Sequence, residues 1–236
     1  MTKAIEPSSL GLRRISLLEG LPVERLDAIA KECAWRLYGE GDQVVSRASG
    51  DRGVYLVSSG RVRVTTYSAS GRQVTFRDVA AGDWFGEVAA IDGLPRSADV
   101  QALEDTLLAT LPHDSFARLL GEEPSVTQQV LQRLVRLVRS LSERVIDIST
   151  LGVQHRIHVE VLRLAHEAGV ANNGARIDPA PKHADLAGRV STNREQVSRE
   201  MSALQQAGLL AKDGRALLVS DVERLAQMVE RERLSS

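Results

Sequence analysis

Residues 84–98 organise this chain, and they read Trp84-Phe85-Gly86-Glu87-Val88-Ala89-Ala90-Ile91-Asp92-Gly93-Leu94-Pro95-Arg96-Ser97-Ala98. Gly86 allows a close backbone approach and begins a short helical turn, whose free N–H groups favour an anion. Arg96 offers a planar fork of donors to phosphate oxygens, and Ser97 adds a hydroxyl group beside it. A phosphate repels the carboxylate of Glu87, so we expect this carboxylate to accept from another part of the ligand, such as a ribose hydroxyl.

These residue types together predict a site for a nucleotide with one phosphate and a free 2′-hydroxyl. The alternative is a surface strand-turn-strand in which Arg96 is solvated and binds no ligand. A segment of this length is only moderately specific for a nucleotide site. The rest of the chain is therefore needed to decide between the nucleotide site and the solvated surface turn.

Length and composition indicate a globular chain of two modest domains. The chain has 236 residues, of which 43% are apolar and 26% are charged. Because 30 Lys and Arg balance 31 Asp and Glu, any contact with nucleic acid has to come from a local basic cluster. The single Cys33 excludes a disulfide framework and an iron–sulfur cluster, which takes about four cysteines. We find no signal-peptide core and no apolar run of about 18 residues, and we therefore expect a cytoplasmic protein without a membrane partner.

The N-terminal half changes from a helical period to a period of two. Apolar residues recur at helical spacings over residues 10–31, whereas short strands are expected between residue 33 and about residue 111. The expected strands include residues 44–45, 54–57, 62–65 and 74–76. The expected turns are Gly39–Gly41, Ser49–Asp51, Ser58–Gly60, Ser70–Gly71 and Ala81–Asp83. Turns at such regular intervals predict an antiparallel roll or barrel.

A long helix is predicted from Pro124 to about Ile148, after a shorter one over residues 114–120. Its apolar residues are spaced 3, 4, 3, 4 and 3 apart, which is the seam of a coiled coil. The seam consists of Leu131, Leu134, Val138, Leu141, Val145 and Ile148. We favour a two-fold homodimer over packing against the chain's own roll. Residues 148–152 interrupt the pattern and are interpreted as a hinge.

The C-terminal part predicts a winged helix-turn-helix. An amphipathic helix over residues 153–168 and a polar loop precede a short helix over 183–190. A second helix then runs to Gly208, with Thr192 as its N-cap and Glu195 at N3 of a capping box. A hairpin with an Asp213-Gly214 turn and a final helix beginning near Ser220 follow.

The second of these helices exposes residues that can read base edges. Arginine can bridge guanine O6 and N7, and glutamate can accept from cytosine N4. The residues expected to contact DNA are Thr192, Arg194, Glu195, Ser198, Arg199 and Lys212, with Lys182, Arg189 and Arg215 as further phosphate contacts. The alternative is an ordinary solvated helix face.

Two segments carry a resemblance to a known family. Gly86-Glu87, the apolar run and Arg96-Ser97-Ala98 resemble the phosphate-binding cassette of the cyclic-AMP receptor protein (CRP/FNR) family of bacterial transcription regulators. Residues 192–199, Thr-Asn-Arg-Glu-Gln-Val-Ser-Arg, resemble its recognition helix, and the chain is most similar to cyclic-AMP receptor protein (catabolite activator protein)-like members. The resemblance implies an α+β chain in four segments. These are an antiparallel cyclic-nucleotide-binding β-roll over residues 1–123, a dimerisation helix over 124–148, a hinge over 149–152 and a winged helix-turn-helix over 153–236.

The family resemblance implies a cyclic-nucleotide-responsive homodimer that binds a palindromic operator, has RNA polymerase as a partner and is not an enzyme. The expected ligand contacts are Gly86, Glu87, Val88, Arg96, Ser97, Ala98, Leu141 and Ser142. In the family a threonine–serine pair of the long helix recognises the adenine amino group. An ungapped count places Leu141 on the threonine and Ser142 on the serine. We therefore expect cyclic AMP as the ligand, with cyclic GMP as the alternative.

Other functions remain open at this point. The chain can be a cyclic-nucleotide-binding module that regulates a partner protein, or a family member with another ligand or none. A haem is not expected, because no histidine precedes His113 in the roll. A metal-dependent enzyme of the roll fold is not expected either, because neither a nucleophile–base pair nor a cluster of metal ligands is visible.

Overall fold

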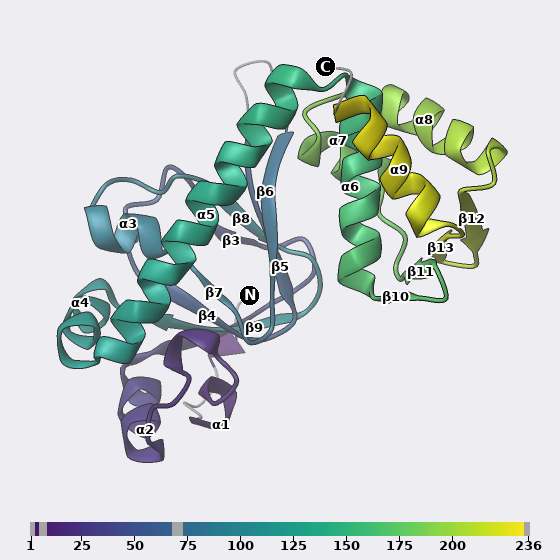
Figure 1. Cartoon of the computed structure of the whole chain (residues 1–236). Coiled ribbons are helices and arrows are strands. Elements are labelled where there is room, and N and C mark those ends of the chain that lie inside the picture. Colours follow the sequence, from purple (N-terminus) through teal and green to yellow (C-terminus); the bar gives the residue numbers. More distant parts are fainter. Residues whose placement is uncertain (1–2, 5–8, 68–72, 234–236) are drawn as a thin grey trace. The chain divides into compact units, whose positions relative to one another are not determined.

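The computed structural model describes residues 3–4, 9–67 and 73–233 (Figure 1). The chain divides into two compact units, residues 1–138 and 139–236, and each is described by itself. The turn predicted at Ser70–Gly71 lies outside the described residues. Within the described part, no helix has both the length and the apolar character that a membrane span requires.

The first unit contains the predicted antiparallel roll, built from two sheets. One sheet has the order β1-β2-β9-β4-β7 and the other has the order β3-β8-β5-β6, with antiparallel pairing throughout both. The strands are β1 (Lys3–Ala4), β2 (Ala34–Tyr38), β3 (Gln43–Val45), β4 (Val54–Ser59), β5 (Arg61–Tyr67), β6 (Gln73–Ala80), β7 (Trp84–Phe85), β8 (Asp99–Ala102) and β9 (Thr106–Leu111). The helices are α1 (Ser9–Leu12), η1 (Ser16–Leu18), α2 (Val23–Glu32), α3 (Glu87–Asp92) and α4 (His113–Glu122).

Strand β4 is buried on both faces because it separates two apolar cores. Val54 and Leu56 join the core that the helices cover, whereas Tyr55 and Val57 point into the interior of the roll. This division follows from the alternation of side chains along a strand. The roll's interior therefore begins at Tyr55, next to the segment that carries Arg96.

Gly60 makes the tight connection between β4 and β5. Its φ of +82° lies in the left-handed region, and a Cβ atom there would come within 2.5 Å of the Asp105 carbonyl oxygen and of Thr106 Oγ1. Gly41 also has a positive φ, of +86°, but no atom lies within 4 Å of its Cβ position. Of these two glycines, Gly60 alone combines a backbone that disfavours other residues with a lack of space.

We expect Gly60→Ala to destabilise the first unit by about 2–5 kcal/mol, from the left-handed backbone and the overpacking together. Gly41→Ala is the matched control and should cost only the backbone part, about 1–2 kcal/mol. Urea unfolding followed by tryptophan fluorescence measures this difference, because both tryptophans, Trp35 and Trp84, lie in the first unit. Equal losses of stability in the two variants would contradict the packing argument.

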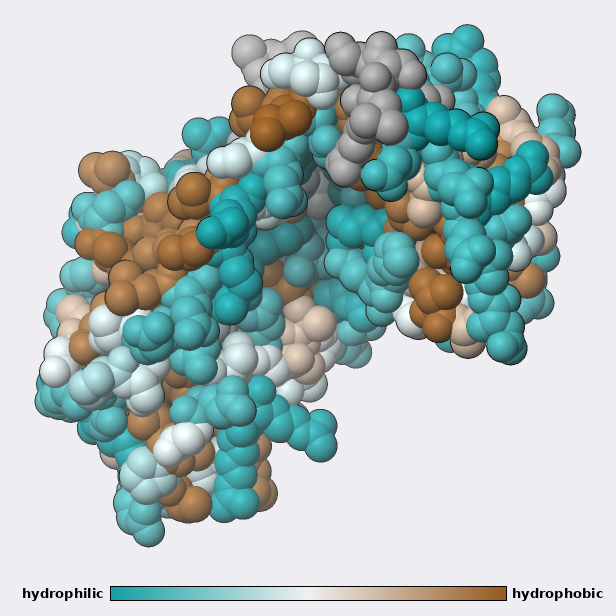
Figure 2. Space-filling view, viewed as in Figure 1, coloured by the Kyte–Doolittle hydropathy of each residue, from teal (hydrophilic) through white to brown (hydrophobic). Residues whose placement is uncertain are grey.

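Helix α5 (Pro124–Thr150) is the predicted long helix, and it extends two residues beyond the expected end. Val126 and Val130 are buried in the core of the first unit. Farther along, Leu131, Val138 and Val145 are 54%, 62% and 64% exposed, so most of the predicted seam lies open. Leu134 is the exception, because it is partly buried and packs against the core of the first unit. Figure 2 shows apolar surface along α5 and beside α3. Such a large apolar surface is typical of an interaction site.

The predicted hinge is shorter in the structure than in the sequence interpretation. Ser149 and Thr150 are helical, and the Thr150 hydroxyl donates to the Ile146 carbonyl, 2.8 Å away. The helical hydrogen bonding ends only at Leu151 and Gly152, and α6 begins at Val153. The boundaries of the four predicted segments stay predictions.

The second unit contains the predicted winged helix-turn-helix. Its elements are α6 (Val153–Ala168), β10 (Val170–Ala171), β11 (Gly174–Ile177), α7 (His183–Arg189), α8 (Arg194–Gln206), β12 (Leu210–Asp213), β13 (Ala216–Val219) and α9 (Val222–Arg233), and the sheet order is β10-β11-β13-β12. The hairpin turn predicted at Asp213-Gly214 is displaced by one residue. Asp213 still pairs with Ala216, so Gly214, with a φ of +58°, and Arg215 form the turn.

Candidate functional site

The Arg96 side chain lies in a cradle of backbone oxygens in the first unit. Its Nη1 donates to the Gly86 carbonyl at 3.1 Å, and its Nη2 donates to the Gly53 carbonyl at 2.7 Å. Gly86 has a φ of +96° and precedes α3, and a Cβ atom there would lie 2.7 Å from Arg96 Nη1. Glycine is required at residue 86 because any side chain would displace the guanidinium.

The structure places an acid against this guanidinium that sequence reasoning missed. Asp51 Oδ2 lies 2.7 Å from Arg96 Nη2 and also accepts from the Tyr55 hydroxyl at 2.5 Å. Burial tends to raise the pKa of Asp51, but hydrogen bonds from Tyr55, from the Gly53 N–H and from Arg96 outweigh it, so this pKa is lowered. Asp51 therefore stays ionised beside Arg96. The only sequence signal was a Ser49–Asp51 turn, which does not distinguish an ion-pair partner from an ordinary turn residue.

One donor of Arg96 is left without an acceptor. The arginine is 5% exposed, and its buried Nε–H finds no hydrogen-bond partner among the described residues. A buried donor without a partner costs free energy, and a donor on a charged group costs more. The Nε–H of Arg96 can therefore donate to a further anionic oxygen while Nη1 and Nη2 stay engaged.

The other predicted ligand residues of the roll differ in their exposure and contacts. Glu87 is buried at 3% exposure, and one oxygen lies 3.5 Å from Nη2 of Arg77 on β6. Ser97 is exposed, Ala98 is buried and Val88 is half-buried. A buried carboxylate with one long contact retains the capacity to accept from a ligand hydroxyl. Sequence reasoning did not identify Arg77, because its partner Glu87 lies on a different element.

Leu141 and Ser142 lie on α5 in the second unit, and both are exposed. Their predicted role at the base of the ligand therefore stays a prediction. On the first-unit part of the same helix, Arg133 binds the Asp83 carboxylate at 3.0 Å and the Trp84 carbonyl at 3.1 Å. These contacts fasten α5 to the residues just before Gly86.

The predicted capping box of the second functional segment is wrong by one residue. The N-cap of α8 is Asn193, whose side chain accepts from the Gln196 N–H at 2.9 Å. Ser191 adopts a φ of +56°, and this turn brings Asn193 rather than Thr192 to the cap. Thr192 is 4% exposed, and its hydroxyl donates to the Gln196 side chain. Glu195 is consequently at N2, not N3, and it lies exposed, so it does not serve as both a cap and a base reader.

The exposed face of α8 carries the remaining predicted DNA contacts. Arg194, Glu195 and Arg199 are exposed, and Ser198 is half-buried. Burial lowers the pKa of His183 at the start of α7, and the nearby charges of Arg194 and Lys212 lower it further. Helix α8 and strand β12 thus bring positive charge together beside the start of α7, as binding to phosphates requires.

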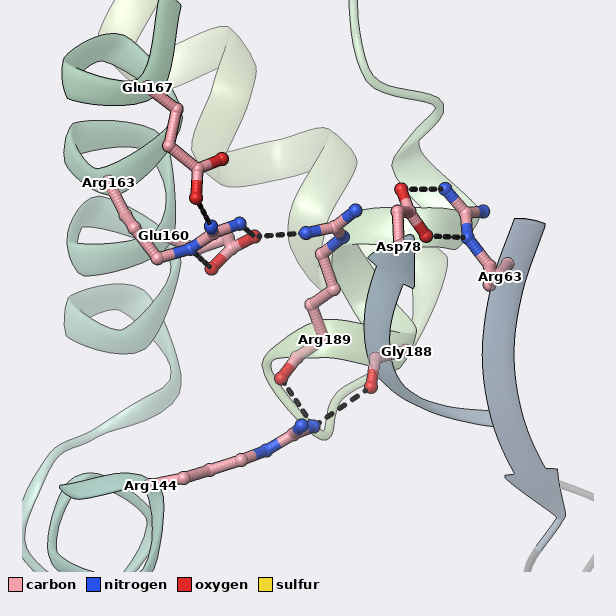
Figure 3. A network of polar contacts seen from close by, with 8 residues as sticks. All are labelled: Arg63, Asp78, Arg144, Glu160, Arg163, Glu167, Gly188 and Arg189. Atoms are coloured by element: carbon pink, nitrogen blue, oxygen red, sulfur yellow. Dashed lines mark hydrogen bonds and ion pairs between the residues drawn. The ribbon is translucent and has the colours of Figure 1, made fainter. Parts of the chain in front are cut away.

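Two predicted phosphate contacts are engaged within the protein. Arg215 lies 2.9 Å from Asp178, and Arg189 lies 3.3 Å from Glu160 on α6 (Figure 3). Farther along the network in Figure 3, the side chain of Arg144 near the end of α5 donates to the Arg189 carbonyl at 2.6 Å and to the Gly188 carbonyl at 3.3 Å. Arg144 therefore caps the C-terminal end of α7, where it also complements the helix dipole.

Metal-ligating groups do not gather in the described part of the chain, where no three His, Cys, Asp or Glu side chains could hold a metal ion together. Burial, with a contribution from Glu32, raises the pKa of Cys33 to about 12, so its thiol stays protonated.

The fold and these two sites define a class of protein in which a ligand-binding β-roll is joined through a long helix to a DNA-binding winged helix. Residues 35–123 match the family model described as the cyclic nucleotide-binding domain, and residues 155–228 match that of the Crp-like helix-turn-helix domain. The two matched segments together cover more than half of the chain. The chain belongs to the CRP/FNR family of transcription regulators, whose members are not enzymes.

Relatives along almost the whole length agree with this family. The chain is 25% identical to the "CRP-like cAMP-activated global transcriptional regulator" of Mycobacterium tuberculosis, over 92% of this chain and 97% of that protein. It is 28% identical to the "Cyclic AMP receptor protein" of Thermus thermophilus, over 82% of this chain and 87% of that protein. Its fold is similar to that of a CooA variant from Carboxydothermus hydrogenoformans, with a TM-score of 0.77, 20% identity and coverage of 96% of this chain and 98% of that one.

The corrected cap gives a local test. We expect Asn193→Ala to lower the hydrogen-exchange protection of the Gln196 amide about fivefold, because an N-cap is worth about 1 kcal/mol. Asn193→Ser, which retains an acceptor, should keep most of the protection. Normal protection in Asn193→Ala together with its loss in Thr192→Ala would restore the capping box that the sequence predicted.

Proposed function

We propose that this chain is a homodimeric regulator that binds a cyclic nucleotide in its β-roll and a palindromic operator with its winged helix. The buried Nε–H of Arg96 is the observation that carries the proposal. A cyclic phosphodiester supplies an anionic oxygen for this donor, and its ribose supplies the 2′-hydroxyl that Glu87 can accept from. Ser97 adds an exposed hydroxyl next to Arg96.

We propose cyclic AMP as the ligand. The names of two relatives that align over most of the chain include this nucleotide, which supports adenine over guanine. Against it, Leu141 stands where the family has a threonine that meets the adenine amino group. Cyclic GMP is therefore the second candidate, and titrating the protein with each nucleotide separates the two.

The exposed stripe of α5 supports a homodimer. Leu131, Val138, Leu141, Val145 and Ile148 each expose 41–64% of their surface, and they follow the 3.5-residue period of a two-stranded coiled coil. A second copy of the same helix has the complementary pattern, and an isologous pairing closes into a dimer.

A two-fold dimer implies a two-fold operator. Each protomer would place α8 in the major groove, with half-sites about 10–10.5 bp apart from centre to centre. Arg194, Glu195 and Arg199 are the proposed base readers, and Lys212 lies nearby on β12 for a phosphate. RNA polymerase is the proposed further partner, since a transcription regulator has to influence it directly or by occlusion.

The cyclic nucleotide would act through differential binding. A ligand shifts an equilibrium only if it binds one arrangement more tightly, and couplings of about 1–3 kcal/mol are typical. The contacts that can convey this coupling follow α5. Arg133 fastens α5 to Asp83 and Trp84 beside the cassette, and Arg144 fastens its other end to the carbonyls of α7. A change at Gly86 and Arg96 can thereby alter the helix that supports α7 and α8.

A second candidate is a cyclic-nucleotide-binding module that regulates a protein partner. The exposed charged face of α8 favours DNA. A mobility-shift assay with palindromic duplexes and added nucleotide separates the two functions.

We expect Arg96→Ala to weaken binding of cyclic AMP by about 2–5 kcal/mol, because the phosphate charge would lose its buried partner. Isothermal titration calorimetry measures this loss. Arg52→Ala, which removes a nearby arginine from the same segment as Asp51, serves as the control and should bind nearly as the wild type does. Unchanged binding in Arg96→Ala would refute the assignment.

For the dimer, we expect Leu131→Glu to raise the dissociation constant at least about a hundredfold, because the new carboxylate would be buried without a partner. Gln132→Glu introduces the same charge one residue away, off the stripe, and should leave the dimer intact. Sedimentation velocity compares the two. A monomeric wild type, or equally stable dimers in both variants, would contradict the proposed seam.

A further inference from the structure

Helix α8 contains a buried acid on its inward face. Val197, Met201 and Leu204 form an apolar stripe that packs into the core of the second unit, and Glu200, between them, is only 8% exposed. Removing a carboxylate from water is costly, so a buried glutamate needs good hydrogen bonds. A leucine at this place would suit the helical pattern better.

Both oxygens of Glu200 are bonded by α6. His158 Nε2 lies 2.7 Å from Oε1, and Gln154 Nε2 donates to Oε2 at 2.9 Å. Gln154 and His158 are four residues apart, so they lie on the same face of α6. Two contacts at different heights fix both the rotation of α8 about its axis and its position along α6.

The bridge lies at an open cleft beside the apolar core that the two helices share. An open cleft of about 300 Å³ is lined by Val153, Gln154, Ile157, Gln196, Arg199 and Glu200. Beside this core, the hydrogen bonds of Glu200 therefore add a polar constraint on how the two helices are aligned. Arg199, the proposed base reader, immediately precedes Glu200 and lines the same cleft. A rotation of α8 that Glu200 no longer prevents would redirect Arg199.

Stability alone does not explain this arrangement. Replacing a buried ion pair by apolar residues of similar size is often neutral or stabilising. We propose that Glu200, held by His158 and Gln154, is a positioning residue that aligns α8 and thereby determines the base preference of Arg199. This inference rests on the proposed binding of DNA, and it adds a function for three residues that make no proposed contact with the duplex.

The test compares sequence preference with stability in the full-length protein. Wild type, Arg199→Ala, Glu200→Gln and the double variant His158→Leu/Glu200→Leu each select duplexes from a randomised palindrome library in the presence of cyclic AMP. Arg199→Ala identifies the base pair that Arg199 reads. Glu167→Gln, which alters an exposed ion pair with Arg163 on the other end of α6, is the matched control.

We expect the double variant to be at least as heat-stable as the wild type. Its preference for the base pair that Arg199 reads should fall about five- to hundredfold, because one bidentate base contact contributes that much discrimination. Its affinity for duplex of random sequence should stay within about twofold of the wild-type affinity. Glu200→Gln should fold and lose part of the preference, and Glu167→Gln should keep it.

An undiminished preference in the double variant would overturn the inference. A second outcome would also overturn it: the double variant unfolds, whereas Glu200→Gln folds and keeps the full base preference. In that case the contact between His158 and Glu200 would only stabilise the fold. If the wild type selects no sequence at all, the proposed operator binding has failed, and that outcome is distinct from both.

Discussion

The buried guanidinium of Arg96 sets the chemistry of the candidate ligand site in the β-roll. Arg96 is held by the carbonyls of Gly53 and Gly86 and by the carboxylate of Asp51, and these three groups fix it without using every donor. The remaining Nε–H is buried, so it gains most from an anion that can enter the roll. Gly86 is required because its missing side chain leaves room for the guanidinium. Three contacts engage Nη1 and Nη2 while the buried Nε–H has no acceptor among the described residues, and this arrangement supports the proposed anion site.

Helix α5 connects this site to the helices proposed to bind DNA. Strand β7 places Trp84 beside Gly86, and Arg133 fastens α5 to the same short segment. At the other end of α5, Arg144 binds carbonyls at the end of α7, and α8 follows after a short turn. Each connection is a charged or hydrogen-bonded contact. Such contacts suit a switch between two arrangements better than continuous apolar packing does.

Much of this fold follows from local sequence patterns. The apolar run of β4, the 3.5-residue stripe of α5 and the amphipathic pattern of α8 each specify an element, and the structure has all three. Contacts between distant residues were beyond such patterns. Asp51 and Arg96 are 45 residues apart, and nothing local marks them as partners. The cap of α8 was misplaced because a positive φ at Ser191 shifts the start of the helix by one residue. Backbone geometry of this kind depends on tertiary packing, not on residue type alone.

The open donor of Arg96 can be observed directly. Nuclear magnetic resonance resolves arginine Nε–H groups, and the Arg96 signal is assigned by comparison with Arg96→Lys. On saturation with cyclic AMP, the Arg96 Nε–H proton is predicted to shift downfield as it binds the phosphate, while the ligand's phosphorus signal moves in the same titration. An Arg96 signal that stays in place while the phosphorus signal shows binding would contradict the central claim.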